Sequence, residues 1–305
     1  MYFDSLVMCA VRQELAATLT GGRVDKIFQP SDTSLALLVR AGGQNHQLLI
    51  SAHAQNARVH LVTAWRLTSG FETPSAFVML LRKYCEGARI VGIGQPEHER
   101  VLHITLQPNL GGAARTGIQP VVLIIEAMGR RSNILLRDSS GIVLGLWKRV
   151  TPLMSRERPI QVHDVYRDPP QPVISEGAAR GGPKLDPSAL DARSLSGVAE
   201  GASGSIWKTL VGAVTGMSPL AAKEITYRAV GAVETPSSLL FDSEKAVAVA
   251  EAARLLFSSC ATGGWEPHLL VSEGRPIAFA PYRPRHIETS AIVQPLSSIS
   301  FAVDR

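Results

Sequence analysis

The chain has few cysteines and no long apolar run. No stretch approaches the roughly 20 apolar residues that cross a bilayer, and Asp4 stands where a secretory signal would carry a lysine or arginine. Cys9, Cys85 and Cys260 are too few and too scattered for a disulfide framework or a Cys-x-x-Cys metal site. Neither a P-loop nor a Gly-x-Gly-x-x-Gly motif occurs. These absences predict a cytoplasmic protein with no membrane partner, metal or cofactor.

The positive charge is concentrated in the first half of the chain. The 305 residues carry 31 lysines and arginines against 26 aspartates and glutamates, a net charge of +5. Residues 1–170 have 19 basic and 13 acidic side chains, whereas residues 171–305 have 12 and 13. Residues 100–158 alone have nine basic and three acidic side chains. This asymmetry predicts a polyanionic partner for the first half.

Two adjacent arginines interrupt an apolar stretch near the middle of the chain. An apolar run ends at Gly129, Arg130 and Arg131 follow, and apolar residues resume at Ile134. The pattern is typical of two strands joined by a tight turn, because Gly129 permits backbone angles that other residues avoid. Guanidinium groups at the tip suit phosphate oxygens. A simply solvated basic turn explains the same residues.

Short apolar runs separated by turns fill residues 1–170. Near-helical spacing of apolar residues predicts a helix over residues 4–19. A second helix is predicted with Thr73 as N-cap and Pro74 as its first residue, ending at Gly87. Strands are expected at residues 23–28, 35–40, 47–50, 58–62, 89–93, 100–106, 120–126, 132–137 and 142–150. The first domain, residues 1–170, is therefore predicted to be an antiparallel β domain decorated with helices.

Composition changes at residues 168–172, which marks the end of this domain. Proline, glycine and alanine enrich residues 171–186, and this predicts a linker. Residues 187–258 have a helical pattern, and residues 259–305 return to strand-like runs.

Two predicted helices flank a short glycine-containing hairpin in the helical region. Ser218 is a suitable N-cap for the second helix and Pro219 a suitable first residue. Free N–H groups at a helix start can hold a phosphate, so Gly216 and Ser218 form a candidate phosphate-binding hairpin. A plain packing pair of helices explains the pattern equally well.

Six short motifs are spread along nearly the whole chain. They are residues 22–30 (GRVDKIFQP), 49–53 (LISAH), 79–90 (MLLRKYCEGARI), 128–134 (MGRRSNI), 216–220 (GMSPL) with 227–229 (YRA), and 265–268 (WEPH). Each motif is weak alone, but the set is specific. In this order they resemble the NFACT family, also described as fibronectin-binding protein A-like or RqcH proteins.

The resemblance implies an α+β protein. Its antiparallel β-rich N-terminal domain would resemble that of formamidopyrimidine-type DNA glycosylases, followed by a helix-hairpin-helix domain and a short β return. Family members are bacterial relatives of NEMF that act in ribosome-associated quality control. They bind a large ribosomal subunit carrying a stalled peptidyl-tRNA and recruit alanyl-tRNA, so that an alanine tail marks the nascent chain. Members usually continue into a coiled coil and an NFACT-R domain, so we expect this chain to be a fragment with weaker ribosome binding.

The resemblance also assigns tRNA-binding residues. The family's Asp-Arg pair, needed for tRNA engagement, matches Glu99 and Arg100 here, with one extra methylene in the acid. Arg100 would contact a phosphate or base edge, while Glu99 orients it or accepts from a base amine. The family's Met-Gly-Arg-His-Ser-Asn reads Met-Gly-Arg-Arg-Ser-Asn here, so Arg130 and Arg131 are expected to contact nucleotides. The wider basic face expected to touch RNA comprises Arg23, Lys26, His53, Arg58, Lys148, Arg149, Arg156 and Arg158.

Glycosylase chemistry is not expected. Glycosylases of the related fold use an N-terminal proline amine, an adjacent glutamate and a four-cysteine zinc finger, whereas this chain has Tyr2, Phe3 and three cysteines. Histidines of the first domain lack metal-ligand spacing. We therefore expect a non-catalytic, metal-free binding protein. Two alternatives stay open: a DNA-binding protein of glycosylase-like fold, and a fibronectin-binding surface adhesin, against which the missing signal sequence argues.

Overall fold

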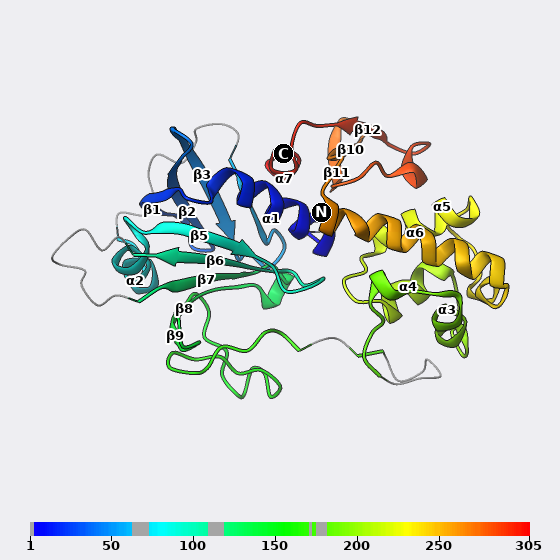
Figure 1. The fold of residues 1–305 in the computed structure, drawn as a ribbon, viewed down its shortest axis with the longest axis horizontal. Coiled ribbons are helices and arrows are strands. Elements are labelled where there is room, and N and C mark those ends of the chain that lie inside the picture. Colours follow the sequence, from blue (N-terminus) through cyan, green and yellow to red (C-terminus); the bar gives the residue numbers. More distant parts are fainter. Residues whose placement is uncertain (1–2, 63–72, 109–118, 171–172, 175–181) are drawn as a thin grey trace. The chain divides into compact units, whose positions relative to one another are not determined.

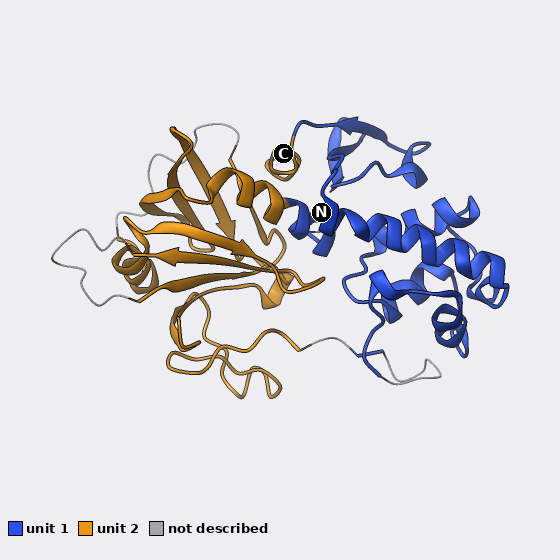
Figure 2. Cartoon of the chain, viewed as in Figure 1, with its two compact units in different colours: residues 1–10, 171–297 blue, residues 11–170, 298–305 orange. Residues whose placement is uncertain are grey.

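The computed structural model describes residues 3–62, 73–108, 119–170, 173–174 and 182–305 (Figure 1). The protein is α+β, as predicted. It divides into two compact units, each discontinuous in sequence (Figure 2). Unit 1 consists of residues 1–10 and 171–297, and unit 2 of residues 11–170 and 298–305. Within the described ranges, no helix combines the length and apolar character needed to cross a membrane.

The predicted domain limits and these units divide the chain differently. Helix α1 (Ser5–Leu19) contributes its first residues to unit 1 and the remainder to unit 2. Residues 171–172 and 175–181 of the expected linker lie outside the described residues. The separation of residues 187–258 from residues 259–305 stays a prediction.

Among the described residues, unit 2 contains a nine-stranded sheet in which neighbouring strands are all antiparallel (Figure 1). Its order is β4-β3-β2-β1-β5-β6-β7-β8-β9. The strands are β1 (Arg23–Ser31), β2 (Ser34–Ala41), β3 (Gln44–Ser51), β4 (Arg58–Leu61), β5 (Arg89–Gly94), β6 (Val101–Gln107), β7 (Val121–Glu126), β8 (Asn133–Asp138) and β9 (Val143–Leu146). The predicted antiparallel β-rich first half is confirmed.

The two halves of this sheet meet at a single registered pair, Arg23 with Arg89. Beyond that pair, Arg82 of helix α2 (Ala76–Cys85) and its C-cap residue Glu86 bond to the backbone of β1. Arg82 donates to the Ile27 carbonyl at 3.0 and 3.1 Å, and Glu86 accepts from the Ile27 N–H at 2.9 Å. Helix α2 thus satisfies strand groups that a neighbouring strand would otherwise bond.

Helix α2 begins two residues later than predicted. Its N-cap is Ser75, whose hydroxyl accepts from the Val78 N–H, so the prediction of Thr73 and Pro74 as N-cap and first residue is wrong. Gln29 accepts from the Ser75 N–H at 2.8 Å and fixes that residue in an extended conformation. A distant side chain therefore sets the start of the helix.

Strand β9 is shorter than the predicted 142–150. The Asn133 side chain accepts from the Lys148 N–H at 2.9 Å and donates to the Lys148 carbonyl at 2.8 Å. An amide side chain thus replaces the backbone ladder at this point, and the strand ends at Leu146.

Unit 1 combines a helical layer with a small sheet. Its helices are α3 (Ala192–Ala199), α4 (Ile206–Ala213), α5 (Pro219–Val230) and α6 (Ser243–Thr262), and its sheet has the order β11 (Arg275–Ala280), β10 (His268–Ser272), β12 (Ile292–Pro295). Leu210, Ile225 and Val249 lie in one buried core that joins α4, α5 and α6. The short helix α7 (Ile299–Val303) belongs to unit 2.

A buried ionic cluster ties helix α5 to the segment after β11. Glu224 is completely buried; it accepts from Arg228 at 2.6 Å, and from the His286 ring and backbone N–H at 2.8 and 3.1 Å. Burial alone raises the pKa of Glu224, but the hydrogen bonds from His286 and Arg228 outweigh burial and lower the pKa to about 2. The ionised carboxylate is therefore the form that stabilises this unit.

Glu224→Gln is expected to destabilise the protein by about 2–3 kcal/mol at pH 7. Because the folded pKa lies below the unfolded value of about 4.3, the contribution of Glu224 is complete above that value. It is lost as the pH falls from about 4.5 toward 2. Urea unfolding at pH 7 and pH 3 measures the free energy of unfolding of wild type and variant. The difference between the two proteins should be smaller at pH 3 than at pH 7. Glu251→Gln, an exposed change on α6, is the control; an equal effect of both variants would contradict this role.

Candidate nucleic-acid interface

One end of the unit 2 sheet gathers several predicted RNA-binding residues. Strands β5, β6 and β7 run side by side (Figure 1). Val101 at the start of β6 pairs with Glu126 at the end of β7, and Glu126 pairs with Asn133 at the start of β8. The Ala127 N–H donates to the Arg100 carbonyl at 2.9 Å. Arg100 therefore lies beside the turn that joins β7 to β8.

This turn is the tight basic turn that the sequence predicts. Residues Gly129–Arg131 form a short 3-10 segment, and Gly129 has a φ of +62°. The Ser132 hydroxyl accepts from the Met128 N–H at 2.8 Å, and the Ser132 N–H donates to the Gly129 carbonyl at 3.0 Å. Arg130 and Arg131 are both exposed. We call Arg100, Arg130, Arg131 and Lys148 the basic edge.

Lys148 joins the basic edge to the loop after β3. Its ammonium donates to the Ala52 carbonyl at 2.7 Å, and burial lowers its pKa. A Cβ on Gly129 would lie 3.5 Å from the Ala54 carbonyl, so the same loop approaches the basic turn. His53 belongs to this loop; its Nδ1 accepts from the Gln55 N–H at 3.2 Å. In the neutral ring, Nε2 then carries the proton and can donate.

Glu99 and Arg100 lie just before β6 rather than within it. The loop is held by the Gln95 side chain, which donates to the Glu99 carbonyl at 2.7 Å. Glu99 is half-buried, and burial raises its pKa, with Arg100 acting in the opposite direction. Arg100 is exposed. The pair thus presents a guanidinium group to solvent beside a carboxylate that can orient it.

Arg158, predicted as an RNA contact, is engaged inside unit 2. Its guanidinium contacts both carboxylate oxygens of Glu126 at 2.6 and 3.2 Å. The Tyr166 hydroxyl donates to Glu126 at 3.0 Å, and burial together with Glu126 raises the pKa of Tyr166. Glu126 is 1% exposed. Arg158 therefore neutralises a buried carboxylate directly behind the basic edge.

The other predicted residues are distributed more widely. Arg23 starts β1 and pairs in register with Arg40, whereas the loop containing His53 lies beyond the opposite end of that strand. Nine residues of strand span about 25 Å, so Arg23 lies far from the basic edge. Lys26 lies over the Phe28 ring on the same strand. The remaining predicted residues are Arg58 at the start of β4, Arg149, which donates to Gln161, and Arg156, which is exposed.

Three residues that organise this end of the sheet were not singled out from the sequence. They are Glu126, Asn133 and Tyr166. Glu126 offered a signal, because it is a lone acid at the end of a completely buried strand. Asn133 belongs to the motif of residues 128–134, but its contact with Lys148 lies 15 residues away and did not follow from that motif. Tyr166 offered no signal, since its partner lies 40 residues away in the chain.

The helical hairpin of unit 1 has the predicted form. Ser218 is the N-cap of α5, and its hydroxyl accepts from the Ala221 N–H at 3.1 Å. The Ser5 hydroxyl donates to the Gly216 carbonyl at 2.7 Å. Ser218 is buried, so its hydroxyl serves the hairpin itself. Phosphate binding by Gly216 and Ser218 stays a prediction.

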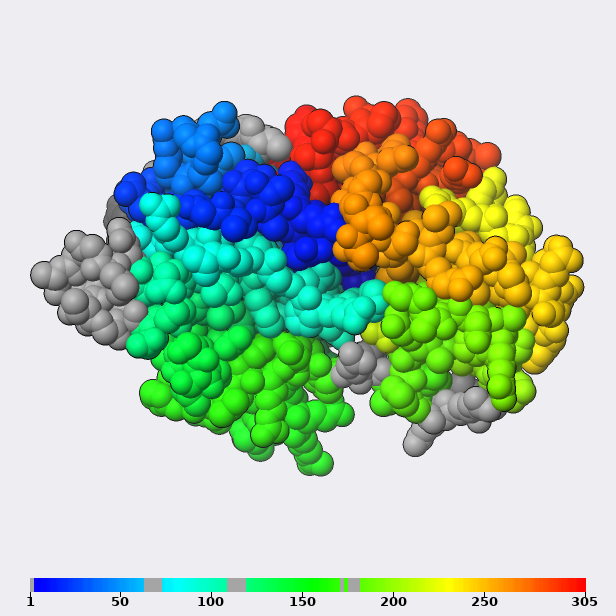
Figure 3. All heavy atoms as spheres, viewed as in Figure 1, coloured from blue at the N-terminus to red at the C-terminus, as the bar shows by residue number. Residues whose placement is uncertain are grey.

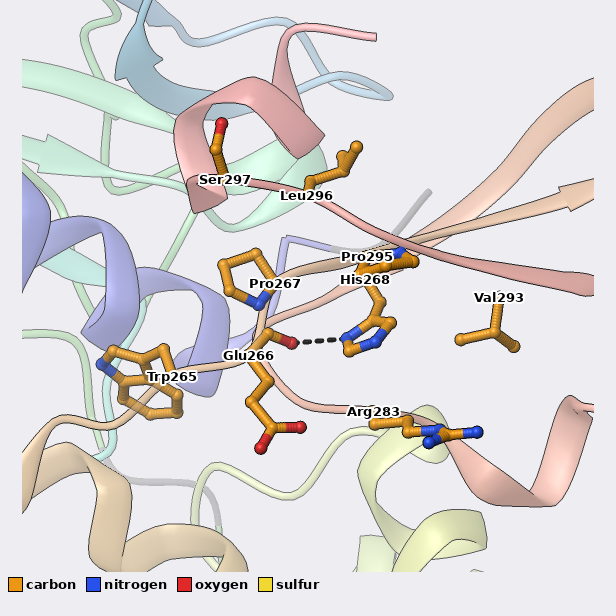
Figure 4. A pocket seen from close by; sticks show the side chains of 9 residues that line it. All are labelled: Trp265, Glu266, Pro267, His268, Arg283, Val293, Pro295, Leu296 and Ser297. Atoms are coloured by element: carbon orange, nitrogen blue, oxygen red, sulfur yellow. Dashed lines mark hydrogen bonds between the residues drawn. The ribbon is translucent and has the colours of Figure 1, made fainter.

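The WEPH motif lines a hollow in unit 1 (Figure 4). The His268 Nδ1 donates to the Glu266 carbonyl at 2.6 Å, since that carbonyl can only accept. Arg283 also lines the hollow and pairs with Glu288 at 2.7 Å. Both basic side chains are therefore already engaged with protein groups.

Several proteins of known name are similar to this chain in sequence. The chain is 34% identical over 246 residues to a Bacillus subtilis protein named "Rqc2 homolog RqcH", a match that covers 79% of this chain and 40% of the relative. A Streptococcus pneumoniae protein of the same name is 36% identical over 176 residues, covering 56% of this chain and 30% of the relative. The chain thus spans less than half the length of these curated relatives.

Solved structures agree with the fold. The N-terminal part of a Streptococcus suis fibronectin/fibrinogen-binding protein has 26% identity and a TM-score of 0.72, and the match covers 99% of this chain and 98% of that one. A Staphylococcus aureus fibrinogen-binding protein, at 24% identity and a TM-score of 0.72, shares the fold over all of this chain and 98% of its own. The family model "NFACT N-terminal and middle domains" matches residues 4–305. The chain therefore belongs to the NFACT family.

Proposed function

We propose that this chain is the tRNA-binding part of a ribosome-associated quality-control factor. The observation that carries the proposal is the basic edge, where the exposed guanidinium groups of Arg100, Arg130 and Arg131 lie at one end of a rigid sheet. The name shared by the Bacillus and Streptococcus relatives supports this role. Such an array neutralises phosphates and can reach base edges in unpaired loops.

In this proposal the protein is a cytoplasmic, non-catalytic factor. Its partners are alanyl-tRNA and a large ribosomal subunit carrying peptidyl-tRNA, and it directs alanine addition to the stalled nascent chain. Peptide-bond formation falls to the ribosome, while Glu99 and Arg100 position the tRNA. The exposed Arg149 and Arg156 of the predicted wider basic face add attraction to phosphate that depends on salt, whereas Arg23 lies at another end of the sheet and adds little.

Binding of this chain to alanyl-tRNA and to a duplex DNA of matched length, titrated with salt, tests the proposal. We expect tighter binding to tRNA at every salt concentration, because unpaired loops expose base edges that a duplex hides. Equal affinity with the same steep salt slope would mean attraction to phosphate alone and would contradict the proposal. Tighter binding to damaged duplex DNA would favour a DNA-binding protein instead.

A fibronectin-binding function is the second candidate, because the solved relative from Streptococcus suis carries that description. Surface plasmon resonance with immobilised fibronectin tests it directly. Saturable binding to fibronectin would favour this candidate if the Arg100→Ala variant binds equally well and if added tRNA does not compete.

A further inference from the structure

A turn next to the basic edge presents two large apolar side chains to solvent. Leu153 is 100% exposed and Met154 is 72% exposed. Single exposed apolar residues are normal on protein surfaces. Here two of them, Leu153 and Met154, are adjacent at the tip of one turn and lie beside the exposed Pro152. We call Leu153 and Met154 the apolar tip. Figure 3 shows the green part of the chain, which includes this turn, on the surface of its unit.

The backbone holds this apolar tip in a defined turn. The Met154 and Ser155 N–H groups both donate to the Thr151 carbonyl, at 2.9 and 3.0 Å. Pro152 occupies the second position of the turn, where its fixed φ is favoured. Below the tip, Val150 and Ile160 exchange two backbone hydrogen bonds of 3.1 and 2.8 Å. The tip is therefore organised before any partner binds, which lowers the entropy lost on binding.

The base of the same loop is fixed to the basic edge. The Arg158 N–H donates to the Ser155 hydroxyl at 3.1 Å, and the Arg158 side chain pairs with Glu126 at 2.6 Å. Glu126 is the last residue of β7, and the basic turn at Gly129–Arg131 follows it. Arg149 and Arg156, on either side of the tip, are exposed cations. The loop that carries the apolar tip is thus anchored at the strand end from which the basic turn starts.

We propose that Leu153 and Met154 form a wedge that packs against unpaired bases of the RNA bound at the basic edge. This inference rests on the proposed function and adds a contact to it. Leucine, methionine and proline are side chains that proteins insert between base steps. Unpaired RNA bases offer flat apolar faces inside a polyanionic backbone. A surface that combines an apolar point with flanking arginines matches both features of such a ligand.

The double variant Leu153→Ser/Met154→Ser tests the wedge. We expect about tenfold weaker binding of alanyl-tRNA with an unchanged salt slope, because apolar contacts release no counterions. Arg156→Ala should instead lower the salt slope by about one unit. Ile292→Ser, which removes a 69% exposed apolar side chain from unit 1, is the matched control and should leave affinity unchanged. Thermal unfolding of all variants checks that they remain folded.

A fluorescent base analogue placed in each tRNA loop gives a second readout. Wild type should change the analogue's fluorescence in one loop, and the double variant should abolish that change. Unaltered tRNA affinity in the double variant, while Arg100→Ala still weakens binding, would overturn the wedge and leave the proposed function standing. The wedge would also be overturned if the double variant lost binding to a ribosomal protein but still bound RNA as tightly as wild type. Failure of wild type to bind tRNA would overturn both proposals.

Discussion

Arg100→Ala is expected to weaken the binding of alanyl-tRNA about tenfold, which corresponds to about 1.4 kcal/mol, and to lower the salt slope by about one unit. Arg100 is exposed, and the hydrogen bond between its carbonyl and the Ala127 N–H fixes its backbone beside the basic turn. The strand pairing therefore sets where the Arg100 side chain starts, and its planar guanidinium group suits a phosphate or a base edge. Fluorescence anisotropy with labelled tRNA at several salt concentrations measures both effects.

Arg23→Ala provides a matched control for this experiment. Arg23 is also an arginine at a strand end of the same sheet, but it lies at the far end of β1 and pairs with Asp25 at 2.7 Å. We expect Arg23→Ala to change affinity less than twofold. Equal losses of tRNA affinity in the two variants would show that Glu99 and Arg100 do not form the tRNA site. Binding would then rest on diffuse attraction to phosphate.

Arg158→Ala is expected to lower the free energy of unfolding by about 3–5 kcal/mol, because it leaves the carboxylate of Glu126 buried without its cation. Glu126 is 1% exposed, and the Arg158 side chain is 15% exposed. Urea unfolding followed by circular dichroism measures the change. Arg156→Ala, two residues earlier and exposed, should change stability by less than about 0.5 kcal/mol.

A double replacement distinguishes the charge from the packing at this position. Glu126→Leu combined with Arg158→Met removes both charges and keeps apolar volume, so much of the lost stability should return. A double variant as unstable as Arg158→Ala would show that shape rather than ionic pairing explains the effect. Arg158→Ala should also weaken tRNA binding, since the Glu126 pair supports the basic edge and the loop of residues 151–157.

Local patterns predicted the elements that depend on neighbouring residues. Gly129 between two apolar runs predicted the strand–turn–strand unit, and β7 and β8 pair as expected from that turn. Ser218 followed by Pro219 predicted the start of α5. These predictions hold because a positive φ and a helix cap are properties of a few consecutive residues.

Predictions failed where a distant side chain intervened. Gln29 fixes Ser75, which moves the start of α2 away from Thr73. Asn133 bonds to the backbone of Lys148, which shortens β9. Neither partner lies within a local pattern, because each contact requires the sheet to be assembled first.

The sequence by itself determined the fold class, the family and the concentration of arginine between residues 100 and 158. The tertiary structure decided which of those arginines are available. Antiparallel pairing brings Arg100 to the turn of Arg130 and Arg131, and the same pairing leaves Arg23 at another sheet end. It also places Glu126 where Arg158 must neutralise it. Charge is a property of each residue, whereas exposure and pairing depend on strand register across the whole sheet.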